Sequence, residues 1–568
     1  MSTWQLAHNP DIQDITLANK QLEHCSSMVD ISYIDEVVQA PEQQGLKRDL
    51  RLRHMVMIAI SGTIGTGLFL TSGSTIATAG PAGALLAYVL IGIWLVFVCQ
   101  AIGEIATLLP LPSSFNSWGA RIFDEALSFQ TTWMSFISGA LTLPAELSAA
   151  AVIASYWIPT DSKFPVWAVP VIIIAIMVCI NMVGVKAYGE LEYWFSILKI
   201  ITIVMFIICG ILVDAGILGH VKYGLAAWHP STGSPFQGGF VGFVKTLVTV
   251  GFAYGGTDST GMTAAESRNP HKHVPKAVNT VLIRIAFFYI TSIFLLASII
   301  PYDDPRLVNT SGSVATAPFT IVFAQAGIGA AANFMNAVVL TSIFSAINSG
   351  YYITTRMLLS LGRNGWAPQS IGYTNPRGVP VVALAVVTLC SCLSLLTIFI
   401  GSGTIFSWFV SLLGSLVFQY WVLVLLLHFR FRYCWKKQGR AVSDLPYVSW
   451  GYPYGSILGL VIGFGCILAI CYLSVINPPV YPGPAASVEE LEIYSTARVV
   501  FAQGLLAAWF PWVCSAVLYF SYKWVNKTKL VRAEDADLDT GRFVPTERDL
   551  KESQIKRPLW KRLVSYIV

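Results

Sequence analysis

The first long apolar segment of the chain contains three glycines in six residues, in the run GTIGTG at residues 62–67. Glycine is among the residues that favour an uninterrupted helix least. A broken backbone at membrane depth is tolerated only where it is buried in protein or lines a cavity. In transporters, such breaks point the positive end of a half-helix at anionic substrate groups. The motif therefore predicts a site near the membrane midplane for a small solute that carries a carboxylate.

The composition is that of a polytopic membrane protein. Of 568 residues, 55% are hydrophobic and 12% are charged, whereas soluble chains carry about 25% charged residues. We count twelve apolar segments long enough to span about 30 Å of hydrocarbon. They are centred near Ile64, Ile91, Leu141, Ile173, Ile203, Tyr254, Ile290, Leu340, Val387, Trp408, Ile462 and Leu506. The expected fold class is an all-α integral membrane protein with twelve transmembrane helices.

The basic residues predict the orientation, because cytoplasmic loops are enriched in Lys and Arg. With a cytoplasmic N-terminus, fourteen basic residues fall in inner loops: Arg121, Lys186, Arg268, Lys272, Lys276, Arg284, Arg356, Arg363, Arg377, Arg430, Arg432, Lys436, Lys437 and Arg440. Five fall in outer loops or helix ends: Lys163, Lys222, Lys245, Arg306 and Arg498. We expect both termini in the cytoplasm. The net charge of +5 reflects this bias and does not indicate nucleic-acid binding.

Three regions follow from these patterns. We expect a cytoplasmic tail over residues 1–52, a transmembrane transporter domain over 53–524 and a second cytoplasmic tail over 525–568. Residues 1–45 contain no apolar stretch of the signal-peptide type. The ten cysteines lie mostly within predicted spans, so they are interpreted as small packing residues and not as a disulfide framework.

Several short segments together resemble a known family. The runs are GTIGTGLF (62–69), AGPAG (79–83), AIGEIA (101–106), LTLPAELSAA (141–150), YGELEYWFS (188–196), AESRNP (265–270), PYDDP (301–305) and NSG (348–350). From about Leu46 to about Lys523, the chain resembles an amino acid permease of the fungal (yeast amino acid transporter) branch of the amino acid/polyamine/organocation superfamily.

The resemblance implies a proton-coupled importer. Helices 1–5 and 6–10 would form a five-plus-five inverted repeat (LeuT-like) around a central site, with broken helices 1 and 6 and two peripheral helices. The sequence offers support of its own, because the sixth apolar segment is also interrupted, at Gly251, Gly255, Gly256 and Gly261. Paired glycine-broken segments in corresponding positions are the best sequence pointer to a transporter binding site.

The two breaks would bind the two ends of an amino acid. Helix 1 would hold the substrate carboxylate on the backbone of Thr63, Ile64, Gly65, Thr66 and Gly67, where freed N–H groups and the helix dipole favour an anion. The alternative is that these glycines only permit close helix packing.

Relatives imply that main-chain carbonyls of helix 6 bind the α-amino group. These would be the carbonyls of Phe252, Ala253 and Tyr254, and the aromatic ring at 252 or 254 could also act as a gate. The alternative is that both rings only pack against lipid or the core.

Two carboxylates in the spans are further candidates for substrate binding, since an intramembrane charge is costly and functional by default. Asp258 stands where fungal relatives usually have Glu; it could face a cationic side chain, transfer a proton or cap the broken helix. Glu146 could determine selectivity or take part in proton linkage, or could be satisfied by the hydroxyls of Thr142 or Ser148. Glu104 lies near a cytoplasmic helix end and is expected to be structural.

Lys199 is the candidate for proton coupling. It is the single lysine deep inside a predicted span, and it matches the helix-5 lysine that proton-coupled bacterial relatives carry in place of a cation site. Burial favours the uncharged form of a lysine, which would allow proton exchange. The alternative is a lysine that extends to the membrane interface. By fold analogy, Ser345 and Asn348 would face Lys199 across the cavity.

The predicted function is import of L-amino acids, neutral or cationic or both, by proton symport with alternating access. A sensing receptor of the same fold and a sodium-coupled carrier are the alternatives, and Lys199 argues against both. No enzyme, metal or cofactor is expected, because no metal spacing or nucleophile–base pair appears in the spans. We expect a plasma-membrane protein whose tails could bind ubiquitin-ligase adaptors and trafficking chaperones. Asn309, in the sequon NTS, is the expected glycosylation site.

Overall fold

The computed structural model describes residues 65–111, 115–159, 163–183, 185–228, 234–256, 264, 267, 269–307, 317–327, 329–375, 378–476, 478–479 and 488–543. These residues are predominantly helical, and no β-strand occurs among them. The helices are α4 (Thr66–Phe69), α5 (Thr71–Leu108), α6 (Phe115–Ile122), α7 (Glu125–Ala154), α8 (Ala168–Val183), α9 (Val185–Asp214), α10 (Gly239–Ala253), α12 (Pro270–Ile283), the π-helix η3 (Arg284–Ile290), α13 (Thr291–Ile299), α14 (Pro318–Gln325), α15 (Gly329–Arg363), α16 (Val381–Ser391), η5 (Cys392–Leu396), α17 (Thr397–Ile400), α18 (Ser402–Lys437), α19 (Tyr454–Val475) and α20 (Val488–Asn526).

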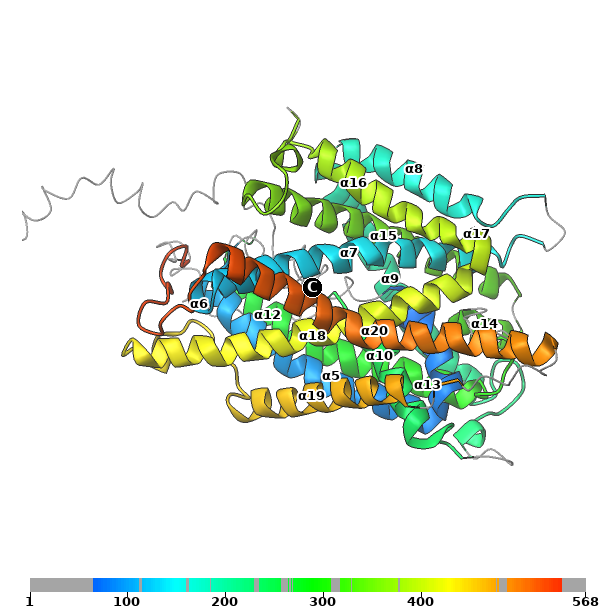
Figure 1. Cartoon of the computed structure of the whole chain (residues 1–568). Coiled ribbons are helices and arrows are strands. Elements are labelled where there is room, and N and C mark those ends of the chain that lie inside the picture. The colour runs from blue at the N-terminus through cyan, green and yellow to red at the C-terminus, as the bar shows by residue number, and fades with distance from the viewer. Residues whose placement is uncertain are drawn as a thin grey trace, which may run out of the picture.

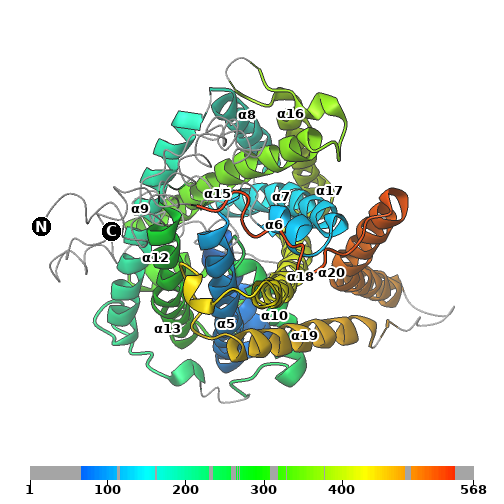
Figure 2. The same ribbon diagram turned by 90° about the vertical axis from the view of Figure 1, so that its left-hand side faces the viewer.

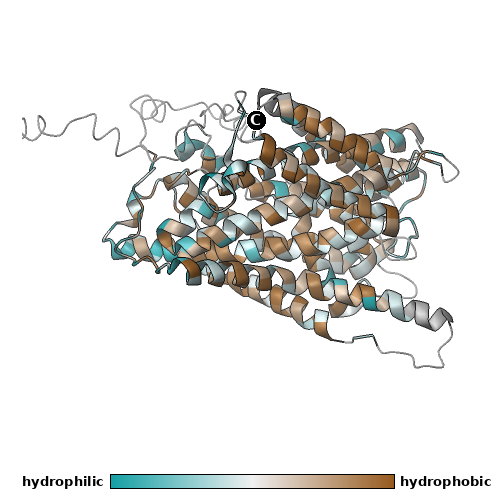
Figure 3. Ribbon diagram, turned by 45° about the horizontal axis from the view of Figure 1, so that its top comes forward, coloured by the Kyte–Doolittle hydropathy of each residue, from teal (hydrophilic) through white to brown (hydrophobic). Residues whose placement is uncertain are grey.

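The long helices run side by side as one bundle (Figure 1). Within the described part of the chain, nine helices are long and apolar enough to cross a membrane, and the shorter apolar helices α8 and α10 accompany them. Figure 3 shows hydrophobic residues along the helices and hydrophilic residues gathered mainly toward their ends. This distribution is that of a multi-pass membrane protein.

One of these nine membrane-spanning candidates, α5, consists of two helices joined at a sharp bend. Gly80 inside α5 has φ +73° and ψ 176°, a backbone conformation that residues with a side chain rarely adopt. The loop before α10 fills the break, since Pro235 O accepts from Ala82 N at 3.1 Å and Gln237 N donates to Ala79 O at 2.9 Å. The predicted first and second spans therefore meet within α5.

The helices differ in how deeply they lie in the bundle. In the most apolar 18-residue stretch of each helix, the buried share of residues is 61% in α5 and 72% in both α7 and α18. It is 22% in α19 and 17% in α20. Figure 2 shows α19 and α20 at the periphery of the bundle. Side chains such as Val461, Leu468 and Phe520 on these two helices are exposed in the protein alone, so these helices present apolar surface suited to lipid.

The start of α4 lies against the end of α10, and glycine makes this approach possible. A Cβ atom on Gly67 would collide with the Cα of Ala253. The packing interpretation of the helix-1 glycines therefore applies at Gly67. Gly65 is different, because the nearest atom to a Cβ there is the Cβ of Ala346, at 4.0 Å.

After α20, the chain folds back across the end of the bundle at which α5 and α18 finish. Val531 N donates to Phe123 O at 2.9 Å, and Arg430 Nη2 donates to Val531 O at 2.6 Å. Arg440 Nη1 donates to Asp539 at 2.7 Å, and this hydrogen bond holds the pKa of the Asp539 carboxyl below its usual value. The first part of the predicted C-terminal tail is thus attached to the helix ends.

A buried ion pair ties α5 to α18. The carboxylate of Glu104, on α5, is fully buried and accepts from Arg432 Nη2 at 2.8 Å. It also accepts from the backbone N–H of Ser449 at 2.7 Å, and His428 Nε2 lies 3.2 Å from its second oxygen. With both oxygens engaged by the neighbouring elements, Glu104 is structural, as the sequence predicts.

We expect Glu104→Ala to destabilise the bundle strongly, because it leaves the Arg432 guanidinium buried without its counter-charge. Loss of one partner of a buried pair costs about 3–5 kcal/mol. The matched control is Asp539→Asn, which breaks the Arg440 pair where the aspartate side chain is 61% exposed and exposed pairs contribute little. Melting temperature in detergent micelles measures both. Equal melting temperatures for the two variants would contradict the structural role of Glu104.

Candidate functional site

A cavity of about 250 Å³ lies where several helices converge. Its walls come from the start of α4, from α7, α9 and α15, from the end of α10 and from α18. Pockets for drug-sized ligands are roughly 300–1,000 Å³, so this cavity is suited to a smaller solute.

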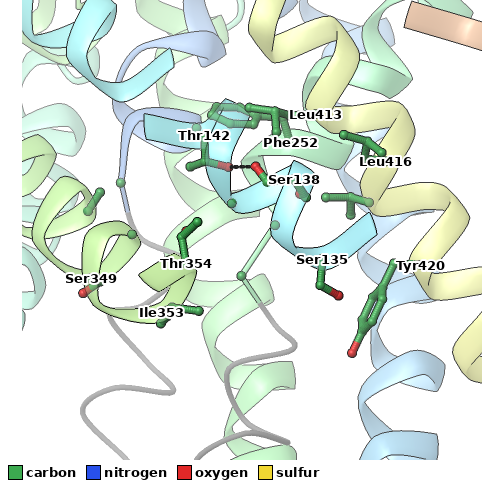
Figure 4. A pocket seen from close by; sticks show the side chains of 18 of the residues that line it. Ser135, Ser138, Thr142, Phe252, Ser349, Ile353, Thr354, Leu413, Leu416 and Tyr420 are labelled. Carbon is green, nitrogen blue, oxygen red and sulfur yellow. Dashed lines mark hydrogen bonds between the residues drawn. The ribbon is translucent and has the colours of Figure 1, made fainter. Parts of the chain in front are cut away.

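One wall is a polar stripe along α7. Its members recur every three or four residues and therefore share one face of the helix: Ser135, Ser138, Thr142 and Glu146. Ser349, Ile353 and Thr354 of α15 lie on another side of the same cavity, and Leu416 and Tyr420 come from α18 (Figure 4). The Thr142 hydroxyl donates to Ser138 O at 2.8 Å, so it is committed to its own helix.

Glu146 connects this stripe to the break in helix 1. Its carboxylate accepts from Thr66 Oγ1 at 2.7 Å, and its second oxygen, Oε2, has no hydrogen-bond partner among the described residues. The Ser148 hydroxyl donates to Pro144 O. Neither Thr142 nor Ser148, the hydroxyls considered from the sequence, is therefore its partner. A carboxylate with one free oxygen at a cavity can accept from a bound cationic group.

The described parts of both glycine-containing segments border the cavity. Gly65, Thr66 and Gly67 line it, and Gly65, the N-cap of α4, has no side chain with which to cap this helix. On the other side, α10 ends at Ala253 and the chain turns through Gly256, where φ is +83°. The unsatisfied N–H groups of a helix start suit an anion, so the two breaks offer complementary groups to a zwitterion.

The aromatic residues of the second break point in different directions. Phe252 and Ala253 line the cavity. Tyr254 is fully buried elsewhere: its hydroxyl donates to Tyr88 O at 3.2 Å, and its ring centroid lies 4.5 Å from that of Tyr289. Tyr254 therefore packs inside the bundle, and of these two rings only Phe252 lines the cavity.

The carbonyls of this break are partly occupied. Phe252 O accepts from Gly255 N at 2.9 Å, and Ala253 O accepts from the hydroxyl of Tyr289 at 3.1 Å. The backbone N–H of Tyr254 is directed at Phe252 O as well. A carbonyl oxygen has two lone pairs, so among these described contacts a second acceptor position remains on Ala253 O. The predicted interaction with an α-amino group has to share these oxygens with the protein.

Lys199 lines the cavity and is only 2% exposed. Its Nζ lies 4.0 Å from Glu192 Oε1, and Ser345 Oγ lies 2.9 Å from each oxygen of the same carboxylate. Ser345 therefore reaches Lys199 only through Glu192. Asn348 is buried outside the cavity lining, and its amide has no hydrogen-bond partner in the described part of the chain.

Glu192 is the charged residue of this cavity to which the sequence analysis assigns no role. It belongs to the run YGELEYWFS, and it precedes Lys199 by seven residues. Seven residues are about two helical turns, so the two side chains share a face. The sequence signal that could have identified Glu192 is its position, two helical turns before an intramembrane lysine.

Four of the predicted site residues lie outside the described residues: Thr63, Ile64, Asp258 and Asn309. Their predicted roles in substrate binding and glycosylation stay predictions. The structure brings together the remaining helix-1 residues, Phe252, Ala253, Glu146 and Lys199 around one cavity. In the described part of the chain, no group of three or more His, Cys, Asp or Glu residues could hold a metal ion.

Comparison with known proteins agrees with this architecture. The family model of the amino acid permeases matches residues 54–516. The chain is 40% identical over 496 residues to the histidine permease HisP of Lactococcus lactis subsp. cremoris (strain MG1363), covering 87% of this chain and 98% of that protein. It is also 40% identical over 500 residues to the lysine-specific permease LysP of the same organism, covering 87% and 93%.

A fungal relative is similar over a comparable length. The amino-acid permease GAP5 of Candida albicans (strain SC5314 / ATCC MYA-2876) is 34% identical over 530 residues, covering 92% of this chain and 82% of that protein. The family match spans most of the chain and includes both broken segments. This chain belongs to the amino acid permease family.

Proposed function

We propose that this permease imports an L-amino acid together with a proton by alternating access. The observation that carries the proposal is the cavity, which brings the start of α4, the end of α10, two carboxylates and a buried lysine within reach of one small solute. Its functional architecture would be twelve transmembrane helices, ten of them in a five-plus-five inverted repeat. In such folds the site lies at the interface of the repeats, near the bilayer midplane.

In this proposal, the substrate carboxylate meets the backbone of Gly65 and Thr66, and the α-amino group faces Phe252 and Ala253. Glu146 completes the site opposite Thr66. The charged side chains among the cavity-lining residues are two carboxylates and one lysine, which favours neutral or cationic substrates over dicarboxylic ones. The relatives named for histidine and lysine make basic amino acids the first to test.

The proposed setting is the plasma membrane with both termini in the cytoplasm. The fourteen-to-five bias of basic residues supports this orientation. On it, the segment that folds back after α20 lies on the cytoplasmic side, where ubiquitin-ligase adaptors and trafficking chaperones could bind the tails. A sensing receptor of the same fold remains the second candidate function, and the position of Lys199 in the cavity wall favours transport.

Purified protein in proteoliposomes should accumulate a labelled amino acid when the outside is acidic, and a protonophore should abolish the accumulation. One pH unit can support up to about tenfold accumulation for one proton per substrate. The panel is lysine, histidine, arginine, leucine and glutamate, of which glutamate should be poorest. Uptake that requires sodium and ignores the proton gradient would refute the coupling. Tight binding without accumulation would identify a receptor.

Gly65→Ala and Gly67→Ala should fail in different ways. A methyl group at Gly65, which lines the cavity, has room, so this variant should be delivered normally and show a KM raised by about tenfold or more. A methyl group at Gly67 meets the backbone of Ala253, so that variant should lose melting temperature and abundance. Surface labelling and uptake kinetics separate the two effects. An amine that lacks the carboxylate should compete poorly; equal competition would show that the carboxylate site is wrongly assigned.

Lys199→Met should abolish concentrative uptake while substrate binding largely survives, since the backbone of both breaks is unchanged. Lys199→Arg should not restore uptake, because a guanidinium stays protonated at any accessible pH. The control is Lys222→Met, which removes an exposed lysine outside the helices and should leave transport intact. A structural lysine would behave in the opposite way, with poor expression of Lys199→Met and near-normal transport by Lys199→Arg. Proton-coupled accumulation by well-folded Lys199→Met protein would exclude the coupling role.

A further inference from the structure

The cavity contains two carboxylates, and they differ in their partners. Glu146, on α7, is bonded to Thr66 and has a second oxygen without a partner in the described part of the chain. Glu192, on α9, is bonded through both oxygens to Ser345 and lies 4.0 Å from the Lys199 ammonium. The two acids are therefore not equivalent candidates for the same task.

We propose that Glu192 is a positioning residue for proton coupling: it holds the charged Lys199 and determines the pH at which that lysine releases its proton, while Glu146 stays available for the substrate. This inference rests on the proposed proton symport. It adds a second ionisable residue to the coupling step and assigns the two cavity carboxylates to different events of the transport cycle.

Because both side chains are buried, the Glu192–Lys199 interaction strongly affects the charge state of the lysine. Glu192 is 4% exposed and Lys199 is 2% exposed, and a buried charge is costly unless a partner compensates it. The carboxylate favours the charged form of the lysine, because loss of the lysine proton would leave Glu192 with only the Ser345 hydroxyl as a partner. A proton therefore stays on Lys199 to a higher pH with Glu192 present than without it.

Ser345 fixes where this carboxylate sits. Its hydroxyl comes from α15 and lies at 2.9 Å from both Glu192 oxygens, so it bridges α15 and α9 at the level of the pair. A hydroxyl donates a single proton, which leaves the carboxylate capacity to accept from Lys199. Movement of α9 relative to α15 would change the geometry of the pair, and in this way the cavity state could be linked to the protonation state.

Among the described side chains, the cavity adds one further charge to this pair. The charged groups that line the cavity there are Glu146, Glu192 and Lys199. Of the helices packed against α9, α8, α13 and α14 contain no charged residue. The charged residues of α15 are Arg356 and Arg363, which follow Ser345 by eleven residues or more. Glu146 interacts electrostatically with Lys199 from α7.

The test compares uptake by proteoliposomes across pH for Glu192→Gln, Glu146→Gln and Ser345→Ala. Glutamine keeps the size of Glu192 and one acceptor oxygen for Ser345, but removes the charge. We expect the pH at which Glu192→Gln loses half its maximal uptake to fall by about one unit or more, as loss of an opposite charge at this distance implies. Its KM at the optimal pH should stay within about threefold of the wild-type value.

The other variants give the matched comparison. Glu146→Gln should raise KM with a smaller change in the pH profile. Ser345→Ala removes the other partner of Glu192, so it should shift the profile by less than Glu192→Gln and toward higher pH. Glu125→Gln, at the exposed start of α7, should match wild type in both measurements. A Glu192→Gln protein with a wild-type pH profile, or with a raised KM and no pH shift, overturns the proposal.

Two further outcomes are decided by the same assay. If the Glu192→Gln protein cannot be purified, the pH profile of Ser345→Ala tests the proposal in its place. An unshifted pH profile for Ser345→Ala then counts against the proposal. If wild-type protein accumulates substrate without a proton gradient, the proposed symport itself fails, and the wild-type arm alone shows this. If the wild type shows proton-driven uptake and the pH profile of the variants is shifted, the result supports both the symport and the role of Glu192.

Discussion

A charge buried in an apolar helix bundle is costly unless hydrogen bonds or an opposite charge compensate it, and this constraint distinguishes the acidic residues of the permease. Glu104 accepts from the Arg432 guanidinium and the backbone N–H of Ser449, its other oxygen lies 3.2 Å from His428 Nε2, and it joins helices. Glu146 and Glu192 are compensated only in part, and both line the cavity. On the proposed function, the opposite charge of Arg432 separates Glu104, which stabilises the bundle, from the two cavity carboxylates, which would interact with a solute or a proton.

Close approach of helices shapes the space between these charges. Gly139 on α7 faces the side chain of Thr354, and a Cβ on Gly350 would lie 2.9 Å from Leu143. The backbones of α7 and α15 therefore come close beside the cavity, as small residues allow in membrane proteins. Gly67 plays the same part between α4 and α10. Glycine on one helix thus leaves room for the side chain of the other where the walls of the cavity meet.

Residues that look equivalent in the sequence take different positions in the fold. Phe252 and Tyr254 flank the same break, yet only Phe252 lines the cavity. The ring of Tyr254 packs between Tyr88 and Tyr289, where its hydroxyl finds the carbonyl of Tyr88. A buried tyrosine needs such a partner, and the partner comes from a helix more than 160 residues away in the chain.

The sequence by itself determined the class of protein, because apolar length, charge bias and glycine-broken segments are local properties of a membrane helix. It also singled out Glu146 and Lys199, since ionisable residues are rare inside spans. Only the tertiary structure decided which residues these ionisable side chains contact. Thr66 meets Glu146 and Ser345 meets Glu192 across 80 and 153 residues, and such contacts depend on how whole helices pack. Residue spacing predicts which side chains share one helix face, but not which face of another helix they will meet.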